Sequence, residues 1–241
     1  SQLQRCSFIV PAWNEAACIA DTIAAIQRSS ESVSAPAEII VVDNNSTDNT
    51  AVVAEAAGAT VVFEPLNQIA RTRNTGARAS TGEWLIFIDA DTLVSPELIN
   101  RVIELLRQGN TIGGGAAVTF DQKLSGLASM LATVWNWWSV RSRTAAGCFI
   151  FCTATAFEQV GGFDERQYVA EELYLSREFR KLAKKQRKAF HIISDYPVVS
   201  SARKKDWYSS AQLVRQILVL LLPGASRSKK FCWVWYKRRP E

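Results

Sequence analysis

The chain has 241 residues, of which 48% are apolar and 21% charged, and its formal net charge is +5. This composition predicts one large globular domain with a sizeable core and excludes a largely disordered chain. No apolar run is long enough to cross a bilayer, no secretory leader pattern is present, and the five cysteines are odd in number. We therefore expect a cytoplasmic protein with reduced thiols.

Strands and helices alternate along the first part of the chain. The apolar runs 6–10, 38–42, 60–63 and 84–88 predict buried strands, and helical patterns follow the first three of them. Asn14 is a candidate cap of the first helix, and Gly58 ends the second. This spacing predicts βαβ units and a mostly parallel sheet. The first strand lacks a following GxGxxG, which argues against an ordinary dinucleotide-binding fold.

The later part of the chain has longer helices. We expect helices over 96–109, 124–140, 154–160 and 170–185, and strands over 112–120, 148–153 and 189–194. A domain boundary is predicted near residue 205. Beyond it, 206–241 reads as an amphipathic helix and a basic aromatic tail.

Two acids, Asp89 and Asp91, follow the buried run Trp84 to Ile88. Only Ala90 separates them. Adjacent carboxylates repel each other, and a bound divalent cation would relieve that repulsion. Open α/β sheets bind ligands at the carboxyl ends of their strands. The pattern therefore predicts a metal-assisted site for a phosphorylated ligand. The simpler alternative is a polar loop in which Asp91 caps the next helix.

Five motifs occur in an order that resembles a known family: PAWNEA, VVDNNSTD, ARTRNTGARASTGEWLIFIDADT, VGGFDE and EELYLSREFRK. Each is weak alone, but together they resemble family 2 glycosyltransferases of the GT-A fold over residues 7–203. The resemblance implies a single Rossmann-like, mostly parallel mixed sheet flanked by helices in a domain over 1–205, with a helical C-terminal extension. It assigns nucleotide-sugar binding to about 1–110 and the acceptor to about 111–205.

The resemblance also implies a nucleotide-diphospho-sugar donor. Asp89 and Asp91 would hold Mg²⁺ or Mn²⁺ at its diphosphate, where the ion stabilises the leaving group. The donor would contact Pro11, Ala12, Asn14, Glu15, Asp43, Arg71, Arg73, Asn74, Asp89, Ala90, Asp91 and Arg203. For Asp43 the alternative is an Asx turn, for Asn14 and Glu15 a helix start, and for the arginines a solvated helix face.

The implied reaction is inverting transfer to an acceptor hydroxyl, which needs a general base. Glu172 stands where the family usually has an Asp, and Glu171 is the second candidate. Physics alone would explain both as acids at a helix N-terminus. His191 is the only histidine, and we interpret it as a strand residue rather than a metal ligand. The GGFDE turn is assigned to the acceptor side.

Two rival functions remain open at this stage. A sugar nucleotidyltransferase would have a glycine-rich, basic loop after the first strand. The segment PAWNEA at this place contains no glycine and no basic residue. The second rival function is a non-catalytic nucleotide-sugar-binding or membrane-docked protein. It stays open because Glu172 stands where the family usually has an Asp, so the base could be lost. The clustered Trp135, Trp137 and Trp138 and the basic aromatic tail predict peripheral contact with the inner face of a membrane and a lipid-linked acceptor. They form no nucleic-acid-binding stripe.

Overall fold

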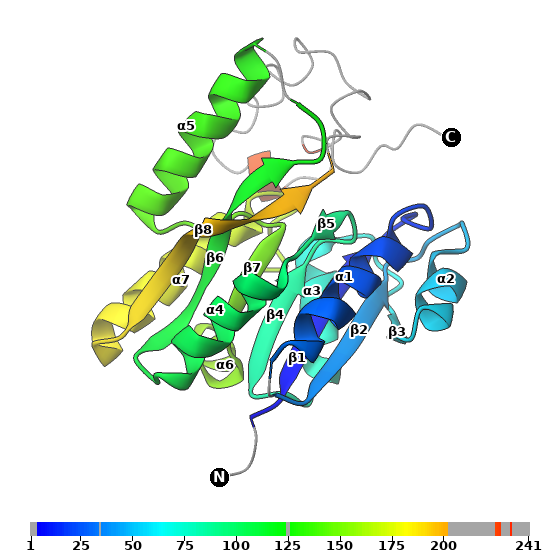
Figure 1. The fold of residues 1–241 in the computed structure, drawn as a ribbon, viewed down its shortest axis with the longest axis horizontal. Helices are drawn as coiled ribbons and strands as arrows, with labels where there is room; N and C mark the ends of the chain where they lie inside the picture. Colours follow the sequence, from blue (N-terminus) through cyan, green and yellow to red (C-terminus); the bar gives the residue numbers. More distant parts are fainter. Residues whose placement is uncertain (1–3, 34, 124–125, 202–224, 228–231, 233–241) are drawn as a thin grey trace.

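The computed structural model describes residues 4–33, 35–123, 126–201, 225–227 and 232. Their strands form one mixed sheet in the order β3-β2-β1-β4-β7-β6-β8-β5 (Figure 1). Four of its seven pairings are parallel and three antiparallel. The strands are β1 (Cys6–Ala12), β2 (Ala37–Asp43), β3 (Thr60–Phe63), β4 (Trp84–Ile88), β5 (Thr92–Leu93), β6 (Thr111–Phe120), β7 (Phe149–Thr153) and β8 (Ala189–Ser200). The predicted α/β class and mostly parallel mixed sheet are confirmed.

Helices cover both faces of the sheet, which explains the continuous apolar runs. On β4, Trp84 and Ile86 pack toward α1, α2 and α4, whereas Leu85 and Phe87 pack toward α3, α6 and α7. A strand covered on both faces has no side that can be polar. The helices are α1 (Ile19–Glu31), α2 (Thr50–Ala56), α3 (Ile69–Ala79), α4 (Pro96–Arg107), α5 (Gly126–Ser142), α6 (Ala154–Val160) and α7 (Glu171–Gln186).

The start of α1 differs from the sequence-based expectation. The helix begins at Ile19, with Cys18 at its N-cap position, so Asn14 does not cap it. Asn14 instead adopts a positive φ of 52° and bonds across to the loop after β2. The sequence pattern also missed β5, because two residues are too few to show a period. β5 pairs with the far end of β8, which extends to Ser200 rather than ending near 194.

Helix α5 stands at the top of the molecule, beyond the other helices (Figure 1). The Asn136 amide fixes it to β6, accepting from the Val118 N–H at 3.0 Å and donating to the Val118 carbonyl at 2.7 Å. Its opposite side is exposed, with Trp137 at 67% and Trp138 at 41%. No helix among the described ranges is long and apolar enough to cross a membrane. The predicted extension over 206–241 lies almost entirely outside those ranges.

Candidate active site

A cleft of about 370 Å³ opens at the carboxyl ends of β1 and β4. Its walls come from the loops after these strands, the start of α3, the segment before β7 and the start of α7. The lining residues include seven of the predicted donor contacts, both predicted bases and several residues that carried no prediction: Pro11, Ala12, Trp13, Glu15, Asn44, Asn67, Ile69, Thr72, Arg73, Asp89, Ala90, Asp91, Gly147, Cys148, Tyr168, Val169, Ala170, Glu171 and Glu172. Residues far apart in sequence therefore meet at one site.

Two loops support each other at the β1 side of the cleft. The Asn14 Oδ1 atom accepts from the Thr47 N–H at 2.7 Å, and the Thr50 hydroxyl accepts from the Glu15 N–H at 2.9 Å. Glu15 is buried and lines the cleft. Asn14 is not a lining residue, so its structural effect here is to hold the loop that carries Glu15.

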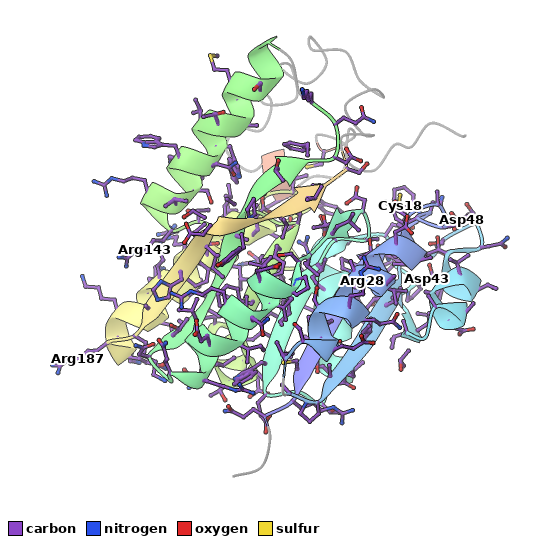
Figure 2. All side chains as sticks on the ribbon, viewed as in Figure 1. Cys18, Arg28, Asp43, Asp48, Arg143 and Arg187 are labelled. Carbon is purple, nitrogen blue, oxygen red and sulfur yellow. The ribbon has the colours of Figure 1, made fainter. Side chains whose placement is uncertain are left out.

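Asp43 is the last residue of β2 and begins the loop that leads to α2, in the region where Figure 2 also labels Asp48. Its Oδ1 atom accepts from the N–H of Ser46, three residues further on, at 3.1 Å, a local side-chain-to-backbone bond that agrees with the alternative of a turn acid. Asp43 does not line the cleft, but its neighbour Asn44 does. The Asn44 amide donates to the carbonyls of Glu64 and Leu66 and thereby orders the segment that leads to α3.

Asp89 and Asp91 both line the cleft directly after β4. Backbone bonds fix their loop, since the Asp89 N–H donates to the Cys148 carbonyl and the Asp91 carbonyl accepts from the Ser201 N–H. The described residues contain no group of three or more His, Cys, Asp or Glu side chains arranged to hold a metal. Two carboxylates nevertheless fit Mg²⁺ or Mn²⁺, because such ions commonly bind one or two protein carboxylates together with substrate phosphates.

Arg73 is the cation at the centre of the cleft, and its side chain is only 3% exposed. Its guanidinium donates to Asp89 at 2.9 Å, to the Gly147 carbonyl at 2.7 Å and to Glu171. Burial alone would lower the pKa of Arg73, but the negative charges of Asp89, Glu171 and Glu172 raise it. Arg73 therefore stays charged and joins the predicted metal ligand to the helix that carries the predicted base.

Glu171 and Glu172 begin α7 in different environments. Glu171 is buried against Arg73, and burial raises its pKa despite that partner. Glu172 is partly exposed in the cleft, and desolvation, reinforced by repulsion from Glu171, raises its pKa to about 8. Ala170 precedes them with a positive φ of 64°, a conformation that non-glycine residues rarely adopt. Such backbone strain is common at functional sites.

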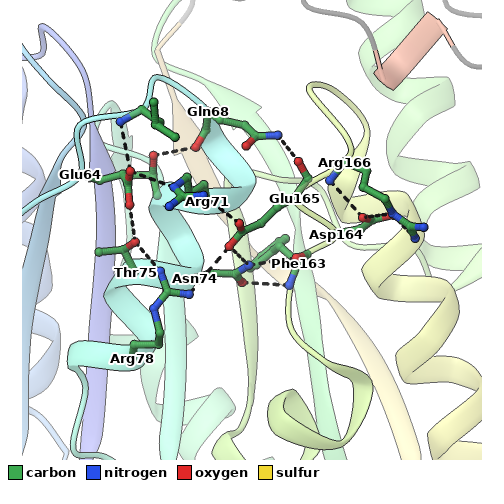
Figure 3. Close-up of polar contacts among 12 residues, drawn as sticks. Glu64, Gln68, Arg71, Asn74, Thr75, Arg78, Phe163, Asp164, Glu165 and Arg166 are labelled. Carbon is green, nitrogen blue, oxygen red and sulfur yellow. Dashed lines mark hydrogen bonds and ion pairs between the residues drawn. The ribbon is translucent and has the colours of Figure 1, made fainter.

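Arg71 and Asn74 point away from the cleft, into a polar network between α3 and the loop 161–168 (Figure 3). The Asn74 side chain accepts from the Phe163 N–H at 3.0 Å and donates to the Phe163 carbonyl at 2.9 Å. Arg71 pairs with Glu64 at 3.0 Å and Glu165 at 3.3 Å. In this arrangement both side chains bind the GGFDE turn to α3, and neither reaches the cleft where the donor contacts were predicted.

Some positions carried no usable sequence signal. Gln68 donates to the carbonyls of Glu165 and Gln167, which fixes the segment before α7. Gly147 and Cys148 line the cleft, although only their place before a strand could have drawn attention to them. His191 pairs with Gly114 in the sheet, is exposed and does not line the cleft. Arg203 lies outside the described residues.

The match to a family model decides the affiliation of the chain. Residues 7–194, more than half of its length, match the model of glycosyl transferase family 2. The chain belongs to this family. This glycosyl transferase family 2 chain is also 34% identical over 110 residues to an uncharacterized glycosyltransferase of Haemophilus influenzae, a match that covers 44% of this chain and 36% of the relative. It is 29% identical over 125 residues to an undecaprenyl-phosphate 4-deoxy-4-formamido-L-arabinose transferase of Sodalis glossinidius, a match that covers 47% of this chain and 37% of the relative. The matches thus span about a third of the length of these curated relatives.

Solved structures show the same fold for this family 2 chain. Glucosyl-3-phosphoglycerate synthase from Mycobacterium tuberculosis, in complex with Mn²⁺, UDP and glucosyl-3-phosphoglycerate, matches with a TM-score of 0.63 and 21% identity over 92% of this chain and 80% of the other. A mannosyltransferase from Pyrobaculum calidifontis, in complex with GDP-Man and Mn²⁺, matches with a TM-score of 0.64 and 20% identity. This match covers 100% of this chain and 67% of the mannosyltransferase. These likenesses confirm the predicted GT-A fold.

Proposed function

We propose that this family 2 chain transfers a sugar, with inversion, from a nucleotide-diphospho-sugar to an acceptor hydroxyl. The observation that supports this most strongly is the meeting of Asp89, Asp91 and Glu172 in one cleft. Two of these carboxylates suit a diphosphate with its cation, and the third suits a proton acceptor. The β1 loop, with Pro11, Ala12 and Glu15, would then contact the nucleotide.

The charges in the cleft favour a divalent cation. Among its described lining residues there are five carboxylates, from Glu15, Asp89, Asp91, Glu171 and Glu172, and one guanidinium, from Arg73. A diphosphate is itself negative and would be repelled by this lining. Asp89 and Asp91 would hold the ion, and Mg²⁺ or Mn²⁺ is of the class found in the two structural neighbours. When bound, it would stabilise the negative charge that develops on the leaving diphosphate.

Glu172 is the better candidate for the base. Glu171 is engaged with Arg73 and buried, whereas Glu172 is partly exposed to the cleft. Its pKa of about 8 gives it a stronger affinity for a proton than an ordinary carboxylate has. As the acceptor oxygen forms its bond to the sugar, the hydroxyl proton would pass to the Glu172 carboxylate. Glu171 would keep Arg73 in place.

A lipid-linked acceptor is the partner that we favour. The relative from Sodalis glossinidius is named as an undecaprenyl-phosphate transferase. A phosphate oxygen is already deprotonated at neutral pH and would need no base, whereas a hydroxyl would. Glu172 therefore favours a hydroxyl acceptor on the lipid. Such an acceptor would place the reaction at the inner face of the membrane.

The two rival functions are less well supported. A sugar nucleotidyltransferase would need a basic phosphate-binding loop after β1, and the loop here contributes Glu15 to the cleft. A non-catalytic nucleotide-sugar-binding protein would have no reason to keep a buried Arg73 paired with Asp89 and Glu171, since burying such charges is costly.

A thermal-shift panel tests the donor side. UDP-, GDP- and TDP-sugars are compared with and without Mn²⁺, and we expect one nucleotide to raise the Tm only when Mn²⁺ is present. Asp91→Ala should abolish that shift, because one of two metal carboxylates is lost. Glu172→Gln should retain it, because this side chain would act on the acceptor. An unchanged shift in Asp91→Ala would reject the metal assignment.

A further inference from the structure

Helix α5 exposes a continuous apolar stripe that the candidate active site does not use. Met130, Leu131, Val134, Trp137 and Trp138 are 56%, 52%, 54%, 67% and 41% exposed. We call these five side chains the α5 face. Their spacing of three, four and seven residues places them on one side of the helix. Asn136 lies on the opposite side, where it holds α5 to Val118 of β6.

We propose that the α5 face docks on a lipid bilayer with anionic headgroups. Tryptophan is favoured at the boundary between headgroups and acyl chains, because its ring is apolar and its N–H is polar. The ring of Trp138 lies 5.2 Å from that of Trp135, so it is supported from within the helix. A stripe this apolar is unusual on a surface that meets only water.

The charges around α5 identify the kind of bilayer. The helix has no acidic residue, and its one charged side chain, Arg141, falls on the same side as Val134 and Trp137. Arg143 follows it and projects from the body of the protein (Figure 2). Arg180 donates to the Arg143 carbonyl at 2.8 Å, and burial together with repulsion from Arg177 lowers its pKa. This end of α5 is therefore a cluster of cations, which anionic headgroups would attract.

The α5 face is connected to the cleft by a short, well-anchored segment. α5 ends at Ser142, and the next residue in the chain that lines the cleft is Gly147. Between them, the Ala145 N–H donates to the Ser176 hydroxyl of α7 at 3.0 Å. These contacts hold the C-terminal end of α5 against α7, one to two turns after Glu172, so a bilayer bound to the α5 face would lie on the α7 side of the cleft. This part of the inference rests on the proposed function, and it places a lipid-linked acceptor beside Glu172.

The test is sedimentation with vesicles of phosphatidylcholine alone or mixed with phosphatidylglycerol. The full chain should bind the mixed vesicles, and Trp137→Ala/Trp138→Ala should weaken that binding by about tenfold or more. Phe63→Ala is the matched control, because Phe63 is an aromatic residue 59% exposed on β3, at the other edge of the sheet. It should bind like the unchanged chain. Arg141→Glu/Arg143→Glu should remove the preference for phosphatidylglycerol.

Three outcomes would overturn the inference: no sedimentation of the unchanged chain, equal binding by the double tryptophan variant, or an equal loss in Phe63→Ala. Light scattering provides a further check. If the double tryptophan variant only converts a dimer into a monomer, the α5 face binds a second copy and the lipid assignment is wrong. Glu172→Gln should bind vesicles normally, so failure of the proposed reaction and failure of this docking surface are separate results.

Discussion

At the scale of single residues, Arg73 decides how the acids of the cleft can coexist. Its two terminal amino groups donate to Asp89, Glu171 and the Gly147 carbonyl, and these bonds offset the cost of burying the charge, although the buried Nε has no hydrogen-bond partner in the described part of the chain. Its planar fork reaches partners on three segments, which a lysine ammonium could not match in geometry. The ring of Phe163 also lies 5.2 Å below the guanidinium carbon. Arg73 thus links the donor side to α7.

Glu172 gives the prediction that belongs to this scale. If Glu172 is the base, Glu172→Gln should lower kcat/KM for a hydroxyl acceptor by about 10²- to 10⁴-fold, since an amide cannot take up the proton. In the unchanged protein kcat/KM should rise with pH up to about 8, where the Glu172 carboxyl loses its proton. The measurement is a pH profile of initial rates. Glu178→Gln, an exposed position on the same helix, is the control and should retain full activity.

At the scale of elements, α3 acts as a clamp on the segment that leads to α7. Asn74, Arg71 and Gln68 each bond to residues between 163 and 167. The Glu64 carboxylate completes the network through Arg71 and Thr75, and these bonds lower its pKa although burial opposes them (Figure 3). Arg71 and Asn74 therefore hold the segment before α7 in place and do not line the cleft, whereas Arg73 between them does.

The turn at Gly161 and Gly162, next to Asn74, allows a matched test of the bonds between α3 and the segment before α7. Gly161 and Gly162 both have positive φ, at 81° and 71°. A Cβ at Gly162 would lie 2.8 Å from Oδ1 of Asn74, whereas one at Gly161 would meet nothing within 4 Å. Gly161→Ala should cost about 1–2 kcal/mol, the strain of the backbone alone. Gly162→Ala should cost more, because it also displaces the Asn74 amide. Urea unfolding measures both, and equal losses would contradict the clamp.

At the scale of the whole molecule, the chain order explains where the cleft lies. From β1 the chain builds β2 and β3 outward on one side, and then returns to place β4 on the other side of β1. Loops from the adjacent carboxyl ends of β1 and β4 therefore diverge and leave a crevice, the usual ligand position in open α/β sheets. Beyond β4, the antiparallel β7 brings Gly147 and Cys148 to the same edge.

The acids of this crevice also predict how stability depends on pH. In the fold the pKa of Glu172 is about 8, above its ordinary value of 4.5, so the folded state holds this proton more tightly. The resulting stabilisation is present below about pH 4.5 and is lost as the pH rises through about 8. The Glu172→Gln variant has no carboxyl at this position and therefore does not lose this stability as the pH rises. Its Tm relative to the unchanged protein should therefore increase between pH 5 and 8, by at least ~2 °C.

The measurement is differential scanning calorimetry in chelator-containing buffer, so that no metal contributes. Glu178→Gln again serves as the control, and its Tm difference from the unchanged protein should stay constant with pH. A constant difference for Glu172→Gln as well would show that its carboxyl is not perturbed in the fold.

The sequence by itself determined the order of the helices and strands except for the two-residue β5, because a strand covered on both faces must be apolar throughout, and runs such as Trp84 to Ile88 show this locally. It also predicted the acids at strand ends, Asp89 and Asp91, which line the cleft. Only the tertiary structure decided that Asn74 and Arg71 face the GGFDE turn, and that Arg73 joins Asp89 to Glu171. Residues on one helix differ in direction by about 100° per step, so neighbouring positions in one motif must serve different surfaces. What each surface meets depends on segments about ninety residues away in the chain, a distance over which local patterns carry no information.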